Sequence, residues 1–329
     1  MDFGPVHVTF TMCARLKFVV IAFASSLFLA ATPARESAHA SASDWTWPPF
    51  IIVSLLITLV LYVVGLAKMY RGRARNSISM WRVASFVAGW LSLLIALDSP
   101  IHELGEQLFW VHMTQHEIMI LISAPLLVLG RPMIGFTWAM PANWRQPIGR
   151  ASKWRFTRSL WTIATLPLVA WMLHAVALWV WHAPVLFDAT LSSDFMHALQ
   201  HISFFGTGLL FWWALVYGHQ GKLGYGGALL YVFTTAVHTS VLGALLTFSN
   251  RAWYSPYFAT APAWRLTALE DQQLGGLIMW IPAGTLLVLV SLGLLVKWIA
   301  ESDRRWQYSR ASAVVGATRR LPDGVADVL

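Results

Sequence analysis

The chain has 329 residues, of which 57% are hydrophobic and only 12% charged, whereas about 25% of residues are charged in a typical soluble domain. This composition excludes a soluble protein and indicates an integral membrane protein, in agreement with 19 tryptophans, a residue that gathers at membrane–water interfaces. The net charge of +8 does not indicate nucleic-acid binding, because membrane proteins concentrate Lys and Arg in cytoplasmic loops.

Residues 1–40 are predicted to be a leader. Arg15 and Lys17 precede the apolar run FVVIAFASSLFLAA, and residues 38–40 (Ala-His-Ala) have the small-x-small pattern of a signal-peptidase site. The mature chain is then expected to begin at Ser41. The alternative is that this segment stays in place as an additional span.

The leader also contains Met12 and Cys13. Met12 directly precedes the basic segment and is an alternative initiator. Cys13 is the only cysteine, so a chain cleaved after the leader has no disulfide, thiolate metal site or cysteine nucleophile.

Residues 41–300 are predicted to form an all-α bundle of seven membrane-spanning helices. A span needs about 20 mostly apolar residues at about 1.5 Å each. Residues 301–329 are expected to be a basic, flexible cytoplasmic tail. The predicted spans cover about residues 48–68, 80–98, 108–130, 160–182, 195–217, 226–248 and 275–299.

The distribution of positive charge predicts the orientation of the bundle. The segments that follow the odd-numbered spans carry eighteen Lys and Arg residues, whereas the opposite side carries only Arg251 and Arg265. Because cytoplasmic loops are enriched in Lys and Arg, we expect the mature N-terminus outside and the C-terminus inside. The protein is thus predicted to be a multi-pass protein of a bacterial cytoplasmic (inner) membrane.

Seven histidines on four of the predicted spans fall in the outer half of the membrane, roughly 3–15 Å below its surface at 1.5 Å per residue. Pairs four residues apart share one helical face, and such polar stripes are expected to face the bundle interior. A single histidine would more simply be an interhelical hydrogen-bonding group, worth about 1 kcal/mol. Seven on one side favour a metal or cofactor site, formed by His112, His116, His174, His182, His197, His201 and His238.

Other polar side chains accompany these histidines. Met113 is a candidate soft ligand beside His116, although methionine is more often a packing residue. The outer loops add further acceptors, among them His102 and Glu103. Asp271, Gln115 and Gln272 are the candidates for orienting ligand rings through their second nitrogen.

The residue types indicate metal or cofactor binding rather than catalysis. Imidazole suits copper, zinc, iron and nickel, and a thioether favours Cu(I). Haem is the alternative cofactor, because paired histidines on facing helices can bind its iron axially. No hydrolytic or nucleophilic constellation indicates an enzyme.

Four segments resemble the bacterial CtaG-type cytochrome c oxidase assembly factors, a seven-span family associated with caa-type oxidases. They are HMTQHEIMILISAPLLVLGRP, WHAPVLFDATLSSDFMHALQHISFFGTGLLFWW, HTSVLGALLTFSNRAWYSPY and LEDQQLGGLIMW. The resemblance covers roughly residues 48–300. Its motif positions correspond to His112, His116, His182, His197, His201, Asp271 and Gln272, with a departure at Glu117, where an apolar residue is expected.

The resemblance implies a role in assembling a haem-copper oxidase, in formation of its copper centre. The expected ligand is therefore Cu(I), held in an outward-facing histidine pocket for transfer to an oxidase subunit or another assembly factor. The loop SNRAWYSPYF, with Tyr254 and Tyr257, is a candidate docking patch at the pocket mouth. The alternatives are a membrane haem or quinone oxidoreductase and a metal-free assembly scaffold.

Overall fold

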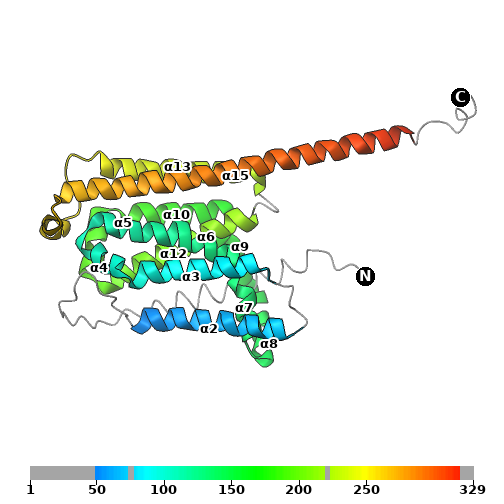
Figure 1. Cartoon of the computed structure of the whole chain (residues 1–329), viewed down its shortest axis with the longest axis horizontal. Coiled ribbons are helices and arrows are strands. Elements are labelled where there is room, and N and C mark those ends of the chain that lie inside the picture. Colours follow the sequence, from blue (N-terminus) through cyan, green and yellow to red (C-terminus); the bar gives the residue numbers. More distant parts are fainter. Residues whose placement is uncertain (1–48, 73–77, 219–222, 319–329) are drawn as a thin grey trace, which may run out of the picture.

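The structure is a computed structural model that describes residues 49–72, 78–218 and 223–318 (Figure 1). Within these ranges all regular secondary structure is helical, which confirms the all-α prediction. The predicted leader, including Met12, Cys13 and Ser41, lies outside the described residues, as does His219.

Six of the described helices are long and apolar enough to cross a membrane, and a bent helix pair makes up to seven. The chain is thus a multi-pass membrane protein. The six are α2 (Pro49–Arg71), α3 (Met80–Asp98), the composite helix Phe109–Gly130, α12 (Asp194–Gly218), α13 (Gly224–Thr247) and most of α15 (Ala268–Thr318).

The predicted fourth span is not one straight helix. It is divided into α9 (Arg155–Ala164) and α10 (Pro167–Trp181), which meet at 69°. Pro167 begins α10, and a proline disfavours helical conformation in the residue before it. Leu166 is accordingly extended, with φ −62° and ψ 131°. The straight span expected over residues 160–182 is therefore corrected to a bent pair.

The third span is a composite of α5 (Phe109–Glu117), the π-helical segment η2 (Ile118–Ser123) and α6 (Ala124–Gly130). Pro125 lies in the first turn of α6 and has no N–H to donate to the preceding turn, which favours local widening of the helix. The carbonyl of Ile120 accepts a hydrogen bond of 2.8 Å from Trp212 Nε1 on α12. This tertiary bond fixes η2 against its neighbour.

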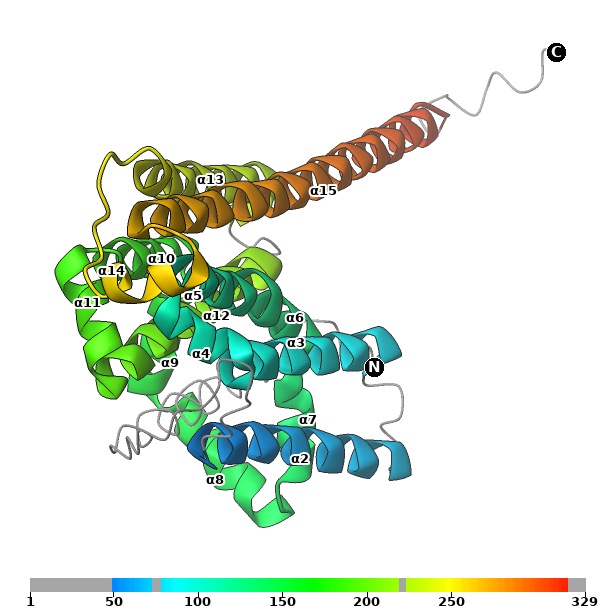
Figure 2. The ribbon, with the colours of Figure 1, turned by 60° about the vertical axis from the view of Figure 1, so that its left-hand side comes forward.

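Two helices, α7 (Pro132–Ala139) and α8 (Ala142–Lys153), lie in the segment that follows the third predicted span. The turn into α7 is made by Arg131 in the left-handed conformation, with φ 49°. α7 packs against α2 (Figure 2), and Lys68 Nζ donates to the carbonyl of Ala139 at 2.6 Å.

α13 and α15 lie side by side, and glycine allows their backbones to approach closely (Figure 1). A Cβ on Gly276 would lie 2.7 Å from the carbonyl oxygen of Gly243 and 2.7 Å from the backbone nitrogen of Thr247. Close contact through small residues is a common way to pack helices within membranes. Because these neighbours are backbone atoms, they cannot rotate away from a side chain.

Gly276→Ala is therefore expected to destabilise the α13–α15 pair by about 1–3 kcal/mol, the usual cost of overpacking. Gly293→Ala, on the same helix with nothing within 4 Å of its Cβ, is the matched control. Thermal unfolding of the two purified variants in one detergent measures the difference. Equal melting temperatures would contradict the backbone contact.

α15 continues well beyond the predicted seventh span. Its 51 residues extend for about 76 Å at 1.5 Å per residue, and its C-terminal part projects from the bundle (Figure 1). Residues 301–318 of the predicted basic tail are helical, as a continuation of α15. Glu301 pairs with Arg304 and Arg305 there, but exposed pairs of this kind contribute little stability.

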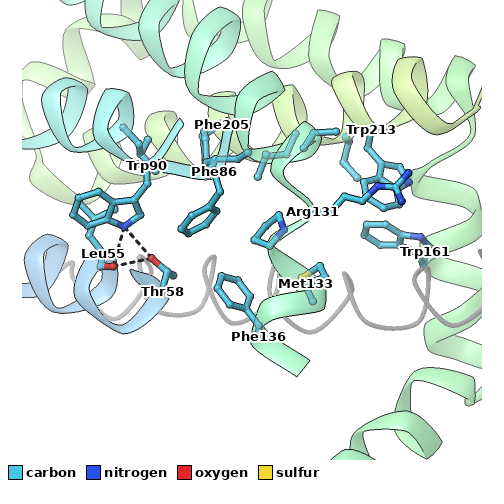
Figure 3. A pocket seen from close by; sticks show the side chains of 16 residues that line it. Leu55, Thr58, Phe86, Trp90, Arg131, Met133, Phe136, Trp161, Phe205 and Trp213 are labelled. Atoms are coloured by element: carbon cyan, nitrogen blue, oxygen red, sulfur yellow. Dashed lines mark hydrogen bonds between the residues drawn. The ribbon is translucent and has the colours of Figure 1, made fainter. Parts of the chain in front are cut away.

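An apolar cavity of about 80 Å³ lies where α2, α3, α7 and α12 meet (Figure 3). Phe86, Phe136 and Trp213 line it, and Arg131 is its charged lining residue. None of the lining residues is a histidine, so the cavity is separate from the polar cluster described next.

Candidate metal centre

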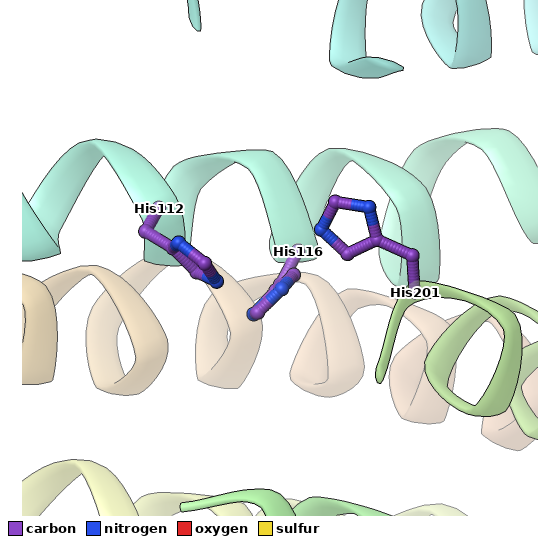
Figure 4. Close-up of side chains that lie close together, drawn as sticks. All are labelled: His112, His116 and His201. Carbon is purple, nitrogen blue, oxygen red and sulfur yellow. The ribbon is translucent and has the colours of Figure 1, made fainter. Parts of the chain in front are cut away.

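Three histidine side chains meet between α5 and α12 (Figure 4). His112 and His116 come from α5 and His201 from α12, and one ligand nitrogen from each lies within 4.8 Å of the other two. We call these residues the inner triad; they are 0%, 3% and 5% exposed. Imidazole nitrogens lie about 2 Å from a bound metal ion. Small side-chain rotations would therefore let these three nitrogens bind the same ion.

His112 and His116 are positioned by α5, whose start is capped by a carboxylate. His112 and His116 are four residues apart on one face, and their ring centroids are 4.4 Å apart. The carboxylate of Asp271, on α15, accepts hydrogen bonds from the backbone N–H groups of Phe109 (2.8 Å) and Trp110 (3.0 Å). Asp271 therefore caps the helix that carries two of the three histidines.

α12 supplies the opposite wall. His197 and His201 are also four residues apart, with ring centroids at 4.3 Å. Between them Gln200 Oε1 lies 3.3 Å from His112 Nε2, and because an amide oxygen can only accept, His112 Nε2 donates. The lone pair of His112 then lies on Nδ1, which is free to bind a metal ion.

Several buried ring nitrogens of this cluster have no hydrogen-bond partner among the described residues. Buried polar atoms are nearly always paired, because leaving one unpaired costs about 1–3 kcal/mol. One ring nitrogen from each residue of the inner triad lies within 4.8 Å of the other two, and such a set fits the donors of a metal ion. The nitrogens without a partner are His112 Nδ1, both nitrogens of His116, His182 Nε2, His197 Nε2 and His201 Nε2.

A second group lies next to the inner triad and nearer the protein surface. His102 and Glu106, on α4 (Pro100–Gln107), and His197 each place one ligand atom within 4.8 Å of the others. We call this group the outer triad: His197 is buried, His102 half-buried and Glu106 exposed. His102 was predicted to be an acceptor in an outer loop and Glu106 was not predicted, although their spacing of four residues was a usable signal.

α4 is held close to α5 by specific contacts. Gly105 lies against α5, where a Cβ would be 3.3 Å from the Cα of His112. The hydroxyl of Tyr257 donates to the carbonyl of Gly105 at 3.0 Å. Gln115 Nε2 donates to the carbonyl of Ala96 at 2.7 Å and lies 3.1 Å from His102 Nδ1, so it orients that ring.

Burial lowers the pKa of the His102 imidazole below its usual range, while the charges of Glu103 and Asp194 act in the opposite direction. A lowered pKa keeps the ring neutral near pH 7. The neutral ring is the form that binds metal ions.

His182 lies near the inner triad without belonging to it. Its ring stacks on Phe204 at 6.0 Å, and the ring of His116 contacts the same phenylalanine at 4.7 Å. His182 Nδ1 donates to the carbonyl of Leu178 at 2.6 Å, which leaves Nε2 without a partner among the described residues.

His174 and His238 belong to neither triad. His174 Nδ1 lies 3.1 Å from the hydroxyl of Thr207, and the ring of His238 contacts Trp171 at 5.4 Å. His174 thus lies between α10 and α12, and His238 lies on α13 against α10.

Met113 and Gln272 have roles in packing. Met113 is 1% exposed and lies in an apolar cluster with Phe109 and Leu246, on the side of α5 that faces α15. Gln272 Oε1 accepts from the backbone N–H of Trp253 at 2.6 Å, and its Nε2 donates to the carbonyl of Leu246 at 3.2 Å. Gln272 thus ties the loop after α13 to α15.

Glu117 ends α5, directly before the π-helical segment. It is half-buried, and its Oε2 has no hydrogen-bond partner among the described residues. Ionisable residues within membrane spans are rare and usually functional.

The fold and the buried histidines define a multi-pass helical membrane protein with a candidate metal centre inside its bundle. Residues 60–301 match the family model described as cytochrome c oxidase caa3 assembly factor, and the chain belongs to this family. The family predicted from the sequence motifs is thereby confirmed.

The curated relatives include uncharacterised mycobacterial proteins. Those of Mycobacterium bovis and Mycobacterium tuberculosis are each 26% identical over 79% of this chain, and that of Mycobacterium leprae is 24% identical over 79%. The aligned region spans 40% of the length of each of these relatives. No solved structure matches the chain.

Proposed function

We propose that this protein holds a Cu(I) ion at the inner triad and delivers it during formation of the copper centre of a haem-copper oxidase. The observation that carries the proposal is the convergence of His112, His116 and His201 within 4.8 Å, with ring nitrogens that lack hydrogen-bond partners among the described residues. Membership of an oxidase assembly family supplies the context.

The charge of the site favours a monovalent ion. The inner triad consists of three imidazoles and no carboxylate, and all three side chains are buried. Burying a charge away from water is costly unless an opposite charge accompanies it. A single positive charge therefore costs less here than the double charge of zinc, and imidazole is a good ligand for copper.

The arrangement of the rings favours an ion over haem. His116 contacts the rings of both His112 (4.4 Å) and His201 (5.3 Å), so the third ring occupies the space that a porphyrin would need between an axial pair. Bound copper would be cargo rather than a catalytic group, in keeping with a role other than catalysis.

The positive-charge asymmetry supports an orientation in the bacterial cytoplasmic membrane with the histidine end outside and the C-terminus inside. The partner is then an oxidase subunit or another assembly factor. The loop around Tyr254 and Tyr257 covers the same end of the bundle as α4 (Figure 2). Both tyrosines are buried and anchor this loop, so they cannot contact a partner as the sequence suggested, and the docking surface would consist of exposed neighbours such as Phe258.

Metal analysis of the purified full-length protein tests the proposal. Protein equilibrated with Cu(I) and a competing chelator, then desalted, is expected to retain copper and to have no visible haem bands. Retention of no copper would overturn metal binding. Haem bands would instead favour the oxidoreductase alternative.

A copper donor and a metal-free scaffold can be distinguished in cells. For a copper donor, variants of the inner triad should lower the copper content of the oxidase while this protein is still produced in normal amount, and added copper should partly restore it. Loss of oxidase together with this protein, without rescue by copper, would favour the scaffold.

A further inference from the structure

The rings of the two triads form one continuous array. The ring of His197 lies between those of His102 and His112, with centroids 5.2 Å from each and both pairs inclined by only 18°. His197 also contacts His201, a member of the inner triad, at 4.3 Å. The two triads share no residue, yet no apolar side chain needs to be crossed between them.

Exposure decreases along this array. Glu106 is exposed and His102 half-buried, whereas His197 is 8% exposed. The members of the inner triad are 5% exposed or less. A ligand that arrives from solvent at this end therefore meets Glu106 before it meets the buried histidines.

The two triads also differ in chemistry. The outer triad combines two imidazoles, which are good copper ligands, with a carboxylate. The carboxylate can offset the positive charge of an ion at this position. The inner triad offers imidazole alone.

We propose that the outer triad, His102, Glu106 and His197, is a second metal site, through which Cu(I) passes between solvent and the inner triad. This inference rests on the proposed function of the inner triad. The imidazoles of His102 and His197 bind the ion, the carboxylate of Glu106 offsets its charge, and His197 is the residue from which it moves inward.

The transfer is an exchange of ligands with no change in oxidation state. The ion leaves Glu106 and His102 as it gains His201 and His112, which lie 4.3 Å and 5.2 Å from His197 by ring centroid. At each step at least one imidazole stays bound, so the ion is never bare in the membrane interior. Several adjoining sites of moderate affinity allow passage where one closed site would trap the ion.

Glu106→Gln tests this inference, because it removes the ligand charge from an exposed position and should leave the fold intact. The matched control is Glu103→Gln, the same change on the same helix at a residue outside both triads. Cu(I) is titrated into each full-length protein against bicinchoninate, with rapid mixing to follow loading. Wild type and Glu103→Gln are expected to bind two ions.

Glu106→Gln is expected to bind one ion tightly, with the outer affinity reduced at least ~10-fold and loading of the inner triad slowed by a similar factor. His116→Phe should lose the inner ion and keep the outer one. One ion in wild type, with unchanged loading in Glu106→Gln, would overturn the outer site and leave the proposed function standing. No ion in wild type would overturn both.

Discussion

Replacing His116 by phenylalanine is expected to abolish Cu(I) retention at the inner triad while the protein remains folded. His116 contacts the rings of both His112 and His201, and both of its nitrogens lack protein partners among the described residues. Its loss should lower affinity by more than the ~10–100-fold that removal of an outer hydrogen-bond partner costs. The ring volume is kept, so no large cavity forms.

The same change should raise the stability of the metal-free protein, because it removes two buried, unpaired polar atoms. His238→Phe is the matched control: its two ring nitrogens also lack partners among the described residues, but it lies in neither triad. The His238→Phe variant should still bind copper. Cu(I) competition measures the change in copper affinity, and thermal unfolding with and without metal measures the change in stability. Undiminished copper binding by His116→Phe would exclude the inner triad as the site.

Replacing Asp271 by alanine is expected to weaken the fold and copper binding together. Asp271 is 0% exposed and accepts hydrogen bonds from the first two backbone N–H groups of α5. Removing it leaves those donors buried without a partner, at a cost of about 1–3 kcal/mol. The first turn of α5 then shifts or frays. Because His112 is in that turn, its ring moves as well.

Copper affinity of Asp271→Ala should therefore fall even though no proposed ligand is changed. Glu270→Gln is a suitable control, because Glu270 is exposed and bonds to Thr267 within its own helix start. Asp271→Asn, which retains one acceptor oxygen, should have an intermediate effect. The measurements are the melting temperature and Cu(I) affinity of all three variants. A change in stability with unaltered affinity would separate the helix cap from the metal site.

The parts of the site that follow from helix periodicity could be predicted from the sequence. His112 with His116, and His197 with His201, each recur after four residues, so each pair had to share a face. Which faces meet is a tertiary property, and the structure brings together His201 with the α5 pair and His197 with α4. The hydrogen bond from His112 to Gln200 likewise depends on the rotation of α12 and has no sequence signal.

Other features were missed because local geometry decides them. α4 is a short polar helix between two spans, and a reading based on hydropathy treats such a segment as a loop. Met113 is one residue from His112, and the rotation of about 100° per residue is enough to turn it toward α15. Pro167 was a usable signal for the break in the fourth span, which was predicted as one span over residues 160–182, but the 69° angle depends on how α9 packs.

The π-helical segment η2 makes the two halves of the third span independent of each other. A π turn holds one residue more than an α turn, so η2 offsets the inner half, from Ala124 onward, by about 100° relative to His112 and His116. Deleting one residue from 118–123 would therefore restore a regular helix and leave Val128 and Gly130 facing their present neighbours. In an alignment of relatives, a one-residue gap here would be compatible with the same histidine pair and the same packing of the inner half.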